Sequence, residues 1–260
     1  MLLFFIRFQS TSLRDKMNKN YKNNLNESIN NPSKILNEKI ILGLDEAGRG
    51  PVLGPMVISV VKVTEKDLDK INSLDLKDSK QLTKKRREEY YNIINECFEV
   101  QKIVLAPEKI DEYMKTSNLN KIELSAFSKL SNHFLKEYEN VKIFIDACSS
   151  SEQSFLNQFK AKLINKKVEI IAEHKADEKY KIVSAASIIA KVTRDNIIES
   201  YKEEFGDIGS GYPGDPKTKE FLKRFVKEHK KLPKIARGSW ATSKKLLKEF
   251  EESKLHKWVK

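Results

Sequence analysis

Short apolar runs alternate with amphipathic stretches along residues 39–205, and this alternation most limits the folds that the chain can adopt. Runs rich in Ile, Leu and Val predict buried strands at 39–46, 55–63, 99–106, 140–147 and 167–174. Apolar residues at helical spacing predict helices at 83–98, 120–138 and 182–205, with Thr83 as the N-cap of the first. Strands followed by helices in this order predict an α/β sheet with both faces covered.

The two ends of the chain differ from this central part. Residues 1–38 combine a short apolar start with an Asn- and Lys-rich tract, which predicts a disordered N-terminal extension, either dispensable or organelle-targeting. Apolar residues recur at helical spacing in 218–231, and 241–254 has the pattern of a second helix. We therefore expect a folded body at 39–212 and a helical C-terminal domain at 213–260.

Positive charge gathers at the C-terminal end of the chain. The formal net charge is +12, and residues 217–260 hold fifteen Lys or Arg against five Asp or Glu. A nearly neutral body with a basic end is typical of a protein that binds a polyanion such as nucleic acid. Lysines that only keep a helical tail in solution would explain the composition equally well.

Composition also bears on location. No stretch approaches the roughly 18 uninterrupted apolar residues of a membrane-spanning helix, so we expect no membrane association. Cys97 and Cys148 match neither a metal-binding spacing nor a redox pair. Free cysteines are typical of a reducing compartment, which predicts a cytoplasmic protein, or a nuclear or organellar one in a eukaryote.

Acidic residues fall at the ends of predicted strands. Asp45 and Glu46 end the first strand, Asp146 ends the fourth, and Asp177 follows the fifth. Sites in open α/β sheets form where strands end, and four carboxylates gathered there would repel one another unless protons, basic partners or cations neutralise them. Oxygen ligands without a Cys/His cluster suit Mg²⁺ or Mn²⁺. Taken singly, each acid is more often a solvated structural residue. Asp45 and Glu46 are strand neighbours, so we expect them to share a site only if the strand breaks there.

Three glycines and two prolines crowd the stretch DEAGRGPVLGP at residues 45–55. A nucleotide-binding loop is one interpretation, but prolines interrupt the pattern and β-branched residues follow where a helix should begin. A plain tight turn is the second interpretation. We favour a third, in which bare backbone approaches a sugar-phosphate closely and Arg49 holds a phosphate.

Several motifs together resemble those of the ribonuclease HII family. The stretch GLDEAGRGPVLGPMV (43–57) resembles the family signature, and LKDSKQLTKKRREE, IDA at Asp146, HKADEKYKIVSAASIIAKVTRD, GSGYPGDPKT and ARGSWATSK agree in order and spacing. The likeness covers about residues 39–245, in an archaeal or eukaryotic-like form. It implies a ribonuclease H-like fold: a mixed five-stranded sheet with flanking helices, plus a small helical C-terminal domain.

The activity that this resemblance implies is that of a metal-dependent endoribonuclease. Such an enzyme uses Mg²⁺ or Mn²⁺ to hydrolyse the RNA strand of RNA–DNA hybrids. It also nicks on the 5′ side of a ribonucleotide embedded in duplex DNA, leaving 3′-hydroxyl and 5′-phosphate ends. The implied setting is ribonucleotide excision repair and DNA replication. We expect a monomer, with accessory subunits left open, and residues 256–260 show no sliding-clamp motif.

The resemblance also implies roles for individual residues. Four carboxylates are implied to be catalytic and to bind the metal: Asp45, Glu46, Asp146 and Asp177. The backbone of the glycine–arginine–glycine element is implied to sense the ribose 2′-hydroxyl: Gly48, Arg49 and Gly50. Tyr212 is implied to stack on the deoxyribose that follows the ribonucleotide. Three basic residues in matching motifs are candidates for phosphate contacts: Lys175, Lys191 and Arg194.

Two other classes of protein remain open at this point. A protein of the same fold could bind hybrids without cleaving them, although massed carboxylates near phosphates would not help it. A dinucleotide-dependent enzyme would instead carry its cofactor on the glycine-rich stretch. Chelation of divalent metal separates the first class from a nuclease, and cofactor absorbance identifies the second.

Overall fold

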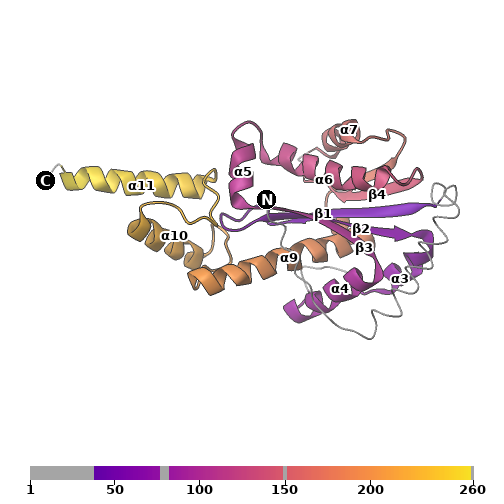
Figure 1. The fold of residues 1–260 in the computed structure, drawn as a ribbon, viewed down its shortest axis with the longest axis horizontal. Coiled ribbons are helices and arrows are strands. Elements are labelled where there is room, and N and C mark those ends of the chain that lie inside the picture. The colour runs from indigo at the N-terminus through magenta and orange to yellow at the C-terminus, as the bar shows by residue number, and fades with distance from the viewer. Residues whose placement is uncertain (1–37, 77–81, 149–150, 259–260) are drawn as a thin grey trace.

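A five-stranded sheet forms the centre of the computed structural model, which describes residues 38–76, 82–148 and 151–258 (Figure 1). The strands, in chain order, are β1 (Ile40–Ala47), β2 (Met56–Thr64), β3 (Glu99–Leu105), β4 (Val141–Asp146) and β5 (Glu169–Glu173). They lie in the order β3-β2-β1-β4-β5. Because β1 is antiparallel to β2 but parallel to β4, the sheet is mixed, and the predicted fold class is confirmed.

Helices cover both faces of this sheet (Figure 1). One face carries α5 (Pro107–Met114), α6 (Leu119–Leu135) and α7 (Glu152–Lys162). The other carries α3 (Leu68–Ser73), α4 (Lys84–Cys97), α8 (Ala176–Lys179) and α9 (Lys181–Phe205). A 3-10 helix, η1 (Glu65–Asp67), follows β2, and the chain ends with α10 (Pro216–His229) and α11 (Ala241–Trp258).

Strand β1 separates two apolar cores, because successive side chains of a strand point to opposite faces. Leu42 and Leu44 pack in the core that α6 covers, whereas Ile41 packs in the core that α9 covers. Gly43 lies against α9, where a Cβ atom would come within 2.3 Å of the carbonyl oxygen of Ile182. The missing side chain at Gly43 therefore lets α9 pack directly on β1.

Gly43→Ala is expected to destabilise the protein by about 2 kcal/mol, because the added methyl group would overlap the backbone of α9 and force the two elements apart. Gly214→Ala is the matched control, since nothing lies within 4 Å of a Cβ atom at that position. Urea unfolding of both variants measures the difference. Equal free energies of unfolding for the two variants would contradict the close packing of α9 on β1.

A third apolar core joins the C-terminal helices to the loop after β1. Phe221 and Leu222 of α10 pack with Val52 and Leu53 of that loop, and with Ile198 of α9. Figure 1 shows α10 and α11 at one end of the molecule, beyond the helices that flank the sheet. Both helices lie where the sequence predicts them, and the boundary between residues 212 and 213 stays a prediction.

The predicted disorder of residues 1–38 falls, except for Glu38, outside the described residues. Within the described ranges, no helix combines the length and the apolar character that crossing a membrane requires.

Candidate metal centre

Strands β1 and β4 separate at the point where the acidic residues begin. Their parallel pairing ends with Leu44 opposite Ile145. The next residue of β4, Asp146, pairs instead with Glu173 of β5. In α/β sheets, the divergence of neighbouring strand ends opens a crevice for a site. Asp45 and Asp146 both lie at this divergence.

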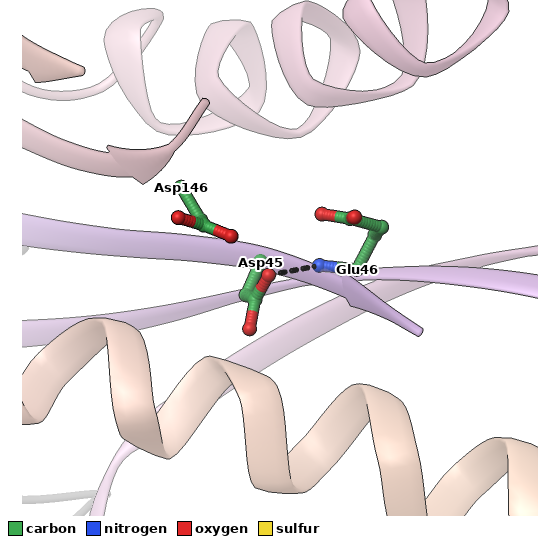
Figure 2. Close-up of side chains that lie close together, drawn as sticks. All are labelled: Asp45, Glu46 and Asp146. Atoms are coloured by element: carbon green, nitrogen blue, oxygen red, sulfur yellow. Dashed lines mark hydrogen bonds between the residues drawn. The ribbon is translucent and has the colours of Figure 1, made fainter. Parts of the chain in front are cut away.

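Three carboxylates meet there: Asp45, Glu46 and Asp146, which we call the acidic cluster. One oxygen of each lies within 4.8 Å of the others. Figure 2 shows Asp45 directed toward α9, while the Glu46 and Asp146 carboxylates lie on the other side of β1. The prediction that Asp45 and Glu46 share a site only at a strand break is wrong. β1 continues to Ala47 in register with β2, and no β4 residue pairs with β1 beyond Leu44, which leaves both side chains free to approach Asp146.

Burial and mutual repulsion disfavour negative charge on the acidic cluster. Burial is the main cause that raises the pKa of Asp45 well above its ordinary value; the charges of Glu46, Asp146 and Asp177 raise it further, and a hydrogen bond with Ser187 lowers it. Burial, then the charge of Asp146, raises the pKa of Glu46 from 4.5 to about 7. At neutral pH the cluster therefore requires either protons or a cation.

Backbone amides orient two of these carboxylates. Glu46 N donates to Oδ1 of Asp45 at 2.7 Å, and Ala176 N donates to Oδ1 of Asp146 at 2.9 Å. Lys175 has a left-handed backbone with φ of 59°, an uncommon conformation for a residue other than glycine. This strained residue immediately precedes α8. The next residue, Ala176, carries the amide that donates to Asp146 of the acidic cluster.

Asp177, the fourth predicted carboxylate, lies near the acidic cluster but is not one of its three members. It is buried on α8, and its charge contributes to the raised pKa of Asp45. The structure thus brings three of the predicted acids into one group and places the fourth within electrostatic reach. Their roles as metal ligands stay predictions.

The donor atoms fit a hard divalent cation. Oε2 of Glu46 is buried and, among the described residues, no hydrogen-bond donor reaches it. Cys148 does not compete as a thiolate ligand, because burial, followed by the charge of Glu46, raises the pKa of its thiol to about 12. Buried carboxylate oxygens with raised pKa values and an unpartnered acceptor are the arrangement that a Mg²⁺ or Mn²⁺ ion would stabilise.

Residues 48–54, which we call the glycine loop, leave β1 directly after the acidic cluster. Gly48 has φ of +87°, and a Cβ atom there would lie 2.7 Å from Cδ of Arg194. A Cβ atom on Gly50 would lie 3.6 Å from the ring of Tyr212. The guanidinium carbon of Arg194 is in turn 5.4 Å from the centre of the Tyr212 ring. The predicted substrate-sensing residues Gly48, Gly50, Arg194 and Tyr212 therefore lie together.

The Arg49 side chain is held by α6. Its guanidinium donates hydrogen bonds to Oε2 of Glu123 and to Oδ1 of Asn120. Glu123 is fully buried, so Arg49 supplies the positive charge that a buried carboxylate requires. The predicted phosphate contact of Arg49 stays a prediction, and in the structure the guanidinium has protein partners.

Lys175, which precedes α8, and Lys191 of α9 form ion pairs with acids three and four residues later in the chain. Lys175 Nζ lies 3.3 Å from Glu178, and Lys191 Nζ lies 3.7 Å from Asp195. The Lys175 pair is exposed and the Lys191 pair half-buried, and pairs at or near the surface contribute little stability; both phosphate contacts stay predictions.

Two residues that the sequence does not single out contribute to this region. Glu123 stands between Ile122 and Leu124, and a charged residue inside a buried apolar stretch of a helix is a usable signal. Arg237 is fully buried; it stands inside the ARGSWATSK motif, but a lone arginine there does not by itself predict burial. Both contact the glycine loop from elements far away in the chain.

The fold and the acidic cluster together define a protein of the ribonuclease H-like class. The family model described as Ribonuclease HII matches residues 42–243. Ribonuclease HII of Methanococcus maripaludis is 72% identical over 244 residues, covering 94% of this chain and 100% of that protein. The chain belongs to the ribonuclease HII family.

Two solved structures are similar over most of the chain. The ribonuclease H2 of Pyrococcus horikoshii OT3 has a TM-score of 0.74 and 40% identity, covering 82% of this chain and 99% of that one. Ribonuclease HII in the PCNA complex from Archaeoglobus fulgidus has a TM-score of 0.71 and 36% identity, covering 79% of this chain and 96% of that one. The resemblance to an archaeal-type, metal-dependent ribonuclease H acting on RNA–DNA hybrids is thereby confirmed.

Proposed function

We propose that this protein, besides cleaving the RNA strand of RNA–DNA hybrids, nicks duplex DNA on the 5′ side of a single embedded ribonucleotide and leaves 3′-hydroxyl and 5′-phosphate ends. The observation that carries this proposal is the position of the glycine loop. It leaves the acidic cluster directly, and Tyr212, which is 46% exposed, lies against Gly50. A metal site that adjoins bare backbone and an exposed aromatic ring is suited to reading one sugar beside the scissile phosphate.

The residues of the site divide the work. Asp45, Glu46 and Asp146 hold Mg²⁺ or Mn²⁺, and Asp177 adds a further negative charge near Asp45. A bound divalent cation supplies an activated water and stabilises the leaving oxygen. The backbone of the glycine loop contacts the ribose 2′-hydroxyl, and Tyr212 packs on the deoxyribose that follows.

Basic residues of the chain bind the phosphates of the substrate. Arg49, Lys175, Lys191 and Arg194 contact phosphates of the substrate, and the basic segment 217–260 attracts the duplex. We propose that one chain suffices for this activity and that it serves ribonucleotide excision repair and DNA replication in the cytoplasm.

A duplex with one ribonucleotide tests the proposed function. We expect a single nick on the 5′ side of the ribose in Mg²⁺ or Mn²⁺ and no nick in EDTA. An intact duplex beside efficient cleavage of a long hybrid would reject the role in reading single ribonucleotides. Binding that survives EDTA without any cleavage in metal would favour a hybrid-binding protein instead.

Tyr212→Ala is expected to lower the rate of nicking at a single ribonucleotide by about tenfold, in the range that aromatic contacts with nucleic acids contribute. Tyr212→Phe keeps the ring and should keep the rate. Single-turnover rates of the two variants give the comparison. Equal losses in both variants would assign the effect to the hydroxyl group, and no loss in either would remove Tyr212 from substrate binding.

A further inference from the structure

One buried arginine donates hydrogen bonds to three carbonyl groups of the glycine loop. Arg237 Nη2 donates to the carbonyl oxygen of Gly48 at 2.6 Å, and Nη1 donates to that of Arg49 at 3.1 Å. Its Nε atom donates to the carbonyl oxygen of Gly54 at 2.9 Å. A guanidinium is planar and presents its donors in a rigid fork, so these bonds fix the loop at both of its ends.

Neighbouring groups extend this contact along the loop. Trp240 Nε1 donates to the carbonyl oxygen of Gly50 at 3.2 Å, and the backbone N of Arg237 donates to that of Val52 at 2.9 Å. The guanidinium carbon of Arg237 lies 4.6 Å from the centre of the Trp240 ring. Five carbonyl groups between residues 48 and 54 thus accept hydrogen bonds from Arg237 and Trp240.

Burying a guanidinium cation costs free energy, so Arg237 is stable there only because its hydrogen bonds compensate for the burial. Arg237 is fully buried, and burial, followed by the charge of Arg194, lowers the pKa of its guanidinium to about 9. Asp111 of α5 holds the next turn, because its carboxylate accepts from Gly238 N at 2.6 Å and from Ser239 N at 2.9 Å. The turn that follows Arg237 is therefore fixed to α5.

The direction of these carbonyl groups determines where the loop amides point. In a trans peptide unit the C=O and the following N–H lie in one plane and point in opposite directions, and the described residues contain no cis peptide. The carbonyls of Gly48 and Arg49 point to Arg237, so the N–H groups of Arg49 and Gly50 point away from it. The carbonyl of Gly50 points to Trp240, and its peptide partner is Pro51, which has no N–H.

We propose that Arg237 is a positioning residue: by holding the carbonyls of Gly48 and Arg49, it directs the amides of Arg49 and Gly50 toward the ribose 2′-hydroxyl. This inference rests on the proposed function, because it concerns the sugar that the glycine loop reads. Arg237 touches neither the substrate nor the metal. Its removal should therefore reduce discrimination at the 2′ position and leave metal binding intact.

Arg237→Met tests the proposal through a ratio of rates. Single-turnover nicking is measured on a duplex with one ribonucleotide and on the same duplex with a 2′-deoxy sugar at that position, which has no 2′ oxygen to accept a hydrogen bond from the amides. We expect the ratio of the two rates to fall by about tenfold or more in Arg237→Met. Only the rate on the ribonucleotide depends on the oriented amides, so only that rate should fall. Arg237→Lys should behave alike, since one ammonium group cannot contact three carbonyls in a fork. A general structural defect would lower both rates equally.

Two further variants keep the test decisive. Trp240→Phe removes only the donor to Gly50 and is expected to lower the same ratio by a smaller factor, about twofold to fivefold. Lys109→Met is the matched control, because its amine is an exposed cation of α5 that pairs with Glu112 at 2.6 Å, outside the basic segment, and should leave the ratio unchanged. The affinity for Mn²⁺ should equal that of the parent protein in every variant.

The outcomes separate this inference from the proposed function. A parent protein that nicks neither duplex would overturn the proposed function itself. A parent protein that discriminates, with folded Arg237→Met and Trp240→Phe variants that discriminate equally well, would overturn the positioning role alone. If Arg237→Met does not fold, the ratio in Arg237→Lys, which keeps the charge, decides.

Discussion

Asp146→Asn is expected to lower metal-dependent cleavage of RNA–DNA hybrids by several orders of magnitude. The substitution keeps the size of the side chain and an oxygen that can accept from Ala176 N, so the turn before α8 should persist. It removes one of three negative charges whose oxygens lie within 4.8 Å of one another. A divalent cation depends on that charge, and the loss of a ligand is poorly tolerated in sites of this kind.

Glu173→Gln is the matched control for this loss. Glu173 ends β5 directly opposite Asp146, yet its carboxylate contacts Lys179 and Tyr180 and not the acidic cluster. Initial rates on a hybrid across a Mg²⁺ titration, together with Mn²⁺ affinities, distinguish the variants. Full Mg²⁺-dependent activity in Asp146→Asn would refute the assignment of the acidic cluster as the metal centre, whereas a loss in both variants would indicate a general defect at the strand ends.

Glu46→Gln is expected to stabilise the metal-free protein at neutral and higher pH while it removes activity. The folded pKa of Glu46 is about 7, above its ordinary value of 4.5, so the folded state binds the extra proton between these values. The free energy of unfolding of the parent protein should therefore fall as pH rises from 4.5 to 7, by about 3 kcal/mol for this one group. Glutamine does not titrate, and the variant should lack this fall.

Urea unfolding in EDTA at several pH values measures the effect, and the two proteins should converge in stability below pH 4.5. Saturating Mg²⁺ should raise the free energy of unfolding of the parent protein at pH 8 and raise that of Glu46→Gln much less. Glu173→Gln should change stability with the opposite sign, because hydrogen bonds from Lys179 and then Tyr180 lower the pKa of Glu173. A difference between parent and Glu46→Gln that does not vary with pH would contradict the burial of Glu46.

The elements with strong local patterns were predictable from the sequence. The five strands follow from their apolar runs, and Thr83 caps α4 as expected, with its Oγ1 accepting from Arg86 N at 3.2 Å. Helices α3, α5, α7 and α8 are not predicted, since they are short and bury few side chains; α7, for example, buries only Phe155 and Phe159. Tertiary packing stabilises such helices more than local propensity does.

Some features of the site were likewise predictable from local sequence, and others were not. Asp45, Glu46, Asp146 and Asp177 could be proposed from their places at strand ends, because strand order and α/β geometry bring such ends together. Arg49 and Glu123 are 74 residues apart in the chain, so no local sequence pattern predicts that they pair. The strand-break requirement failed for a related reason, since the register at which β4 leaves β1 is a property of the whole sheet.

The hydrogen bonds between the glycine loop and Arg237 or Trp240 join residues 183 to 190 positions apart. A chain made from its N-terminus contains all four acids and both ends of the loop long before it contains those donors. The strands that carry the acids can pair while most of the C-terminal helices are still unmade. The surface proposed to distinguish RNA from DNA is therefore completed only once residues 237–240 have been made, after the residues proposed to cut.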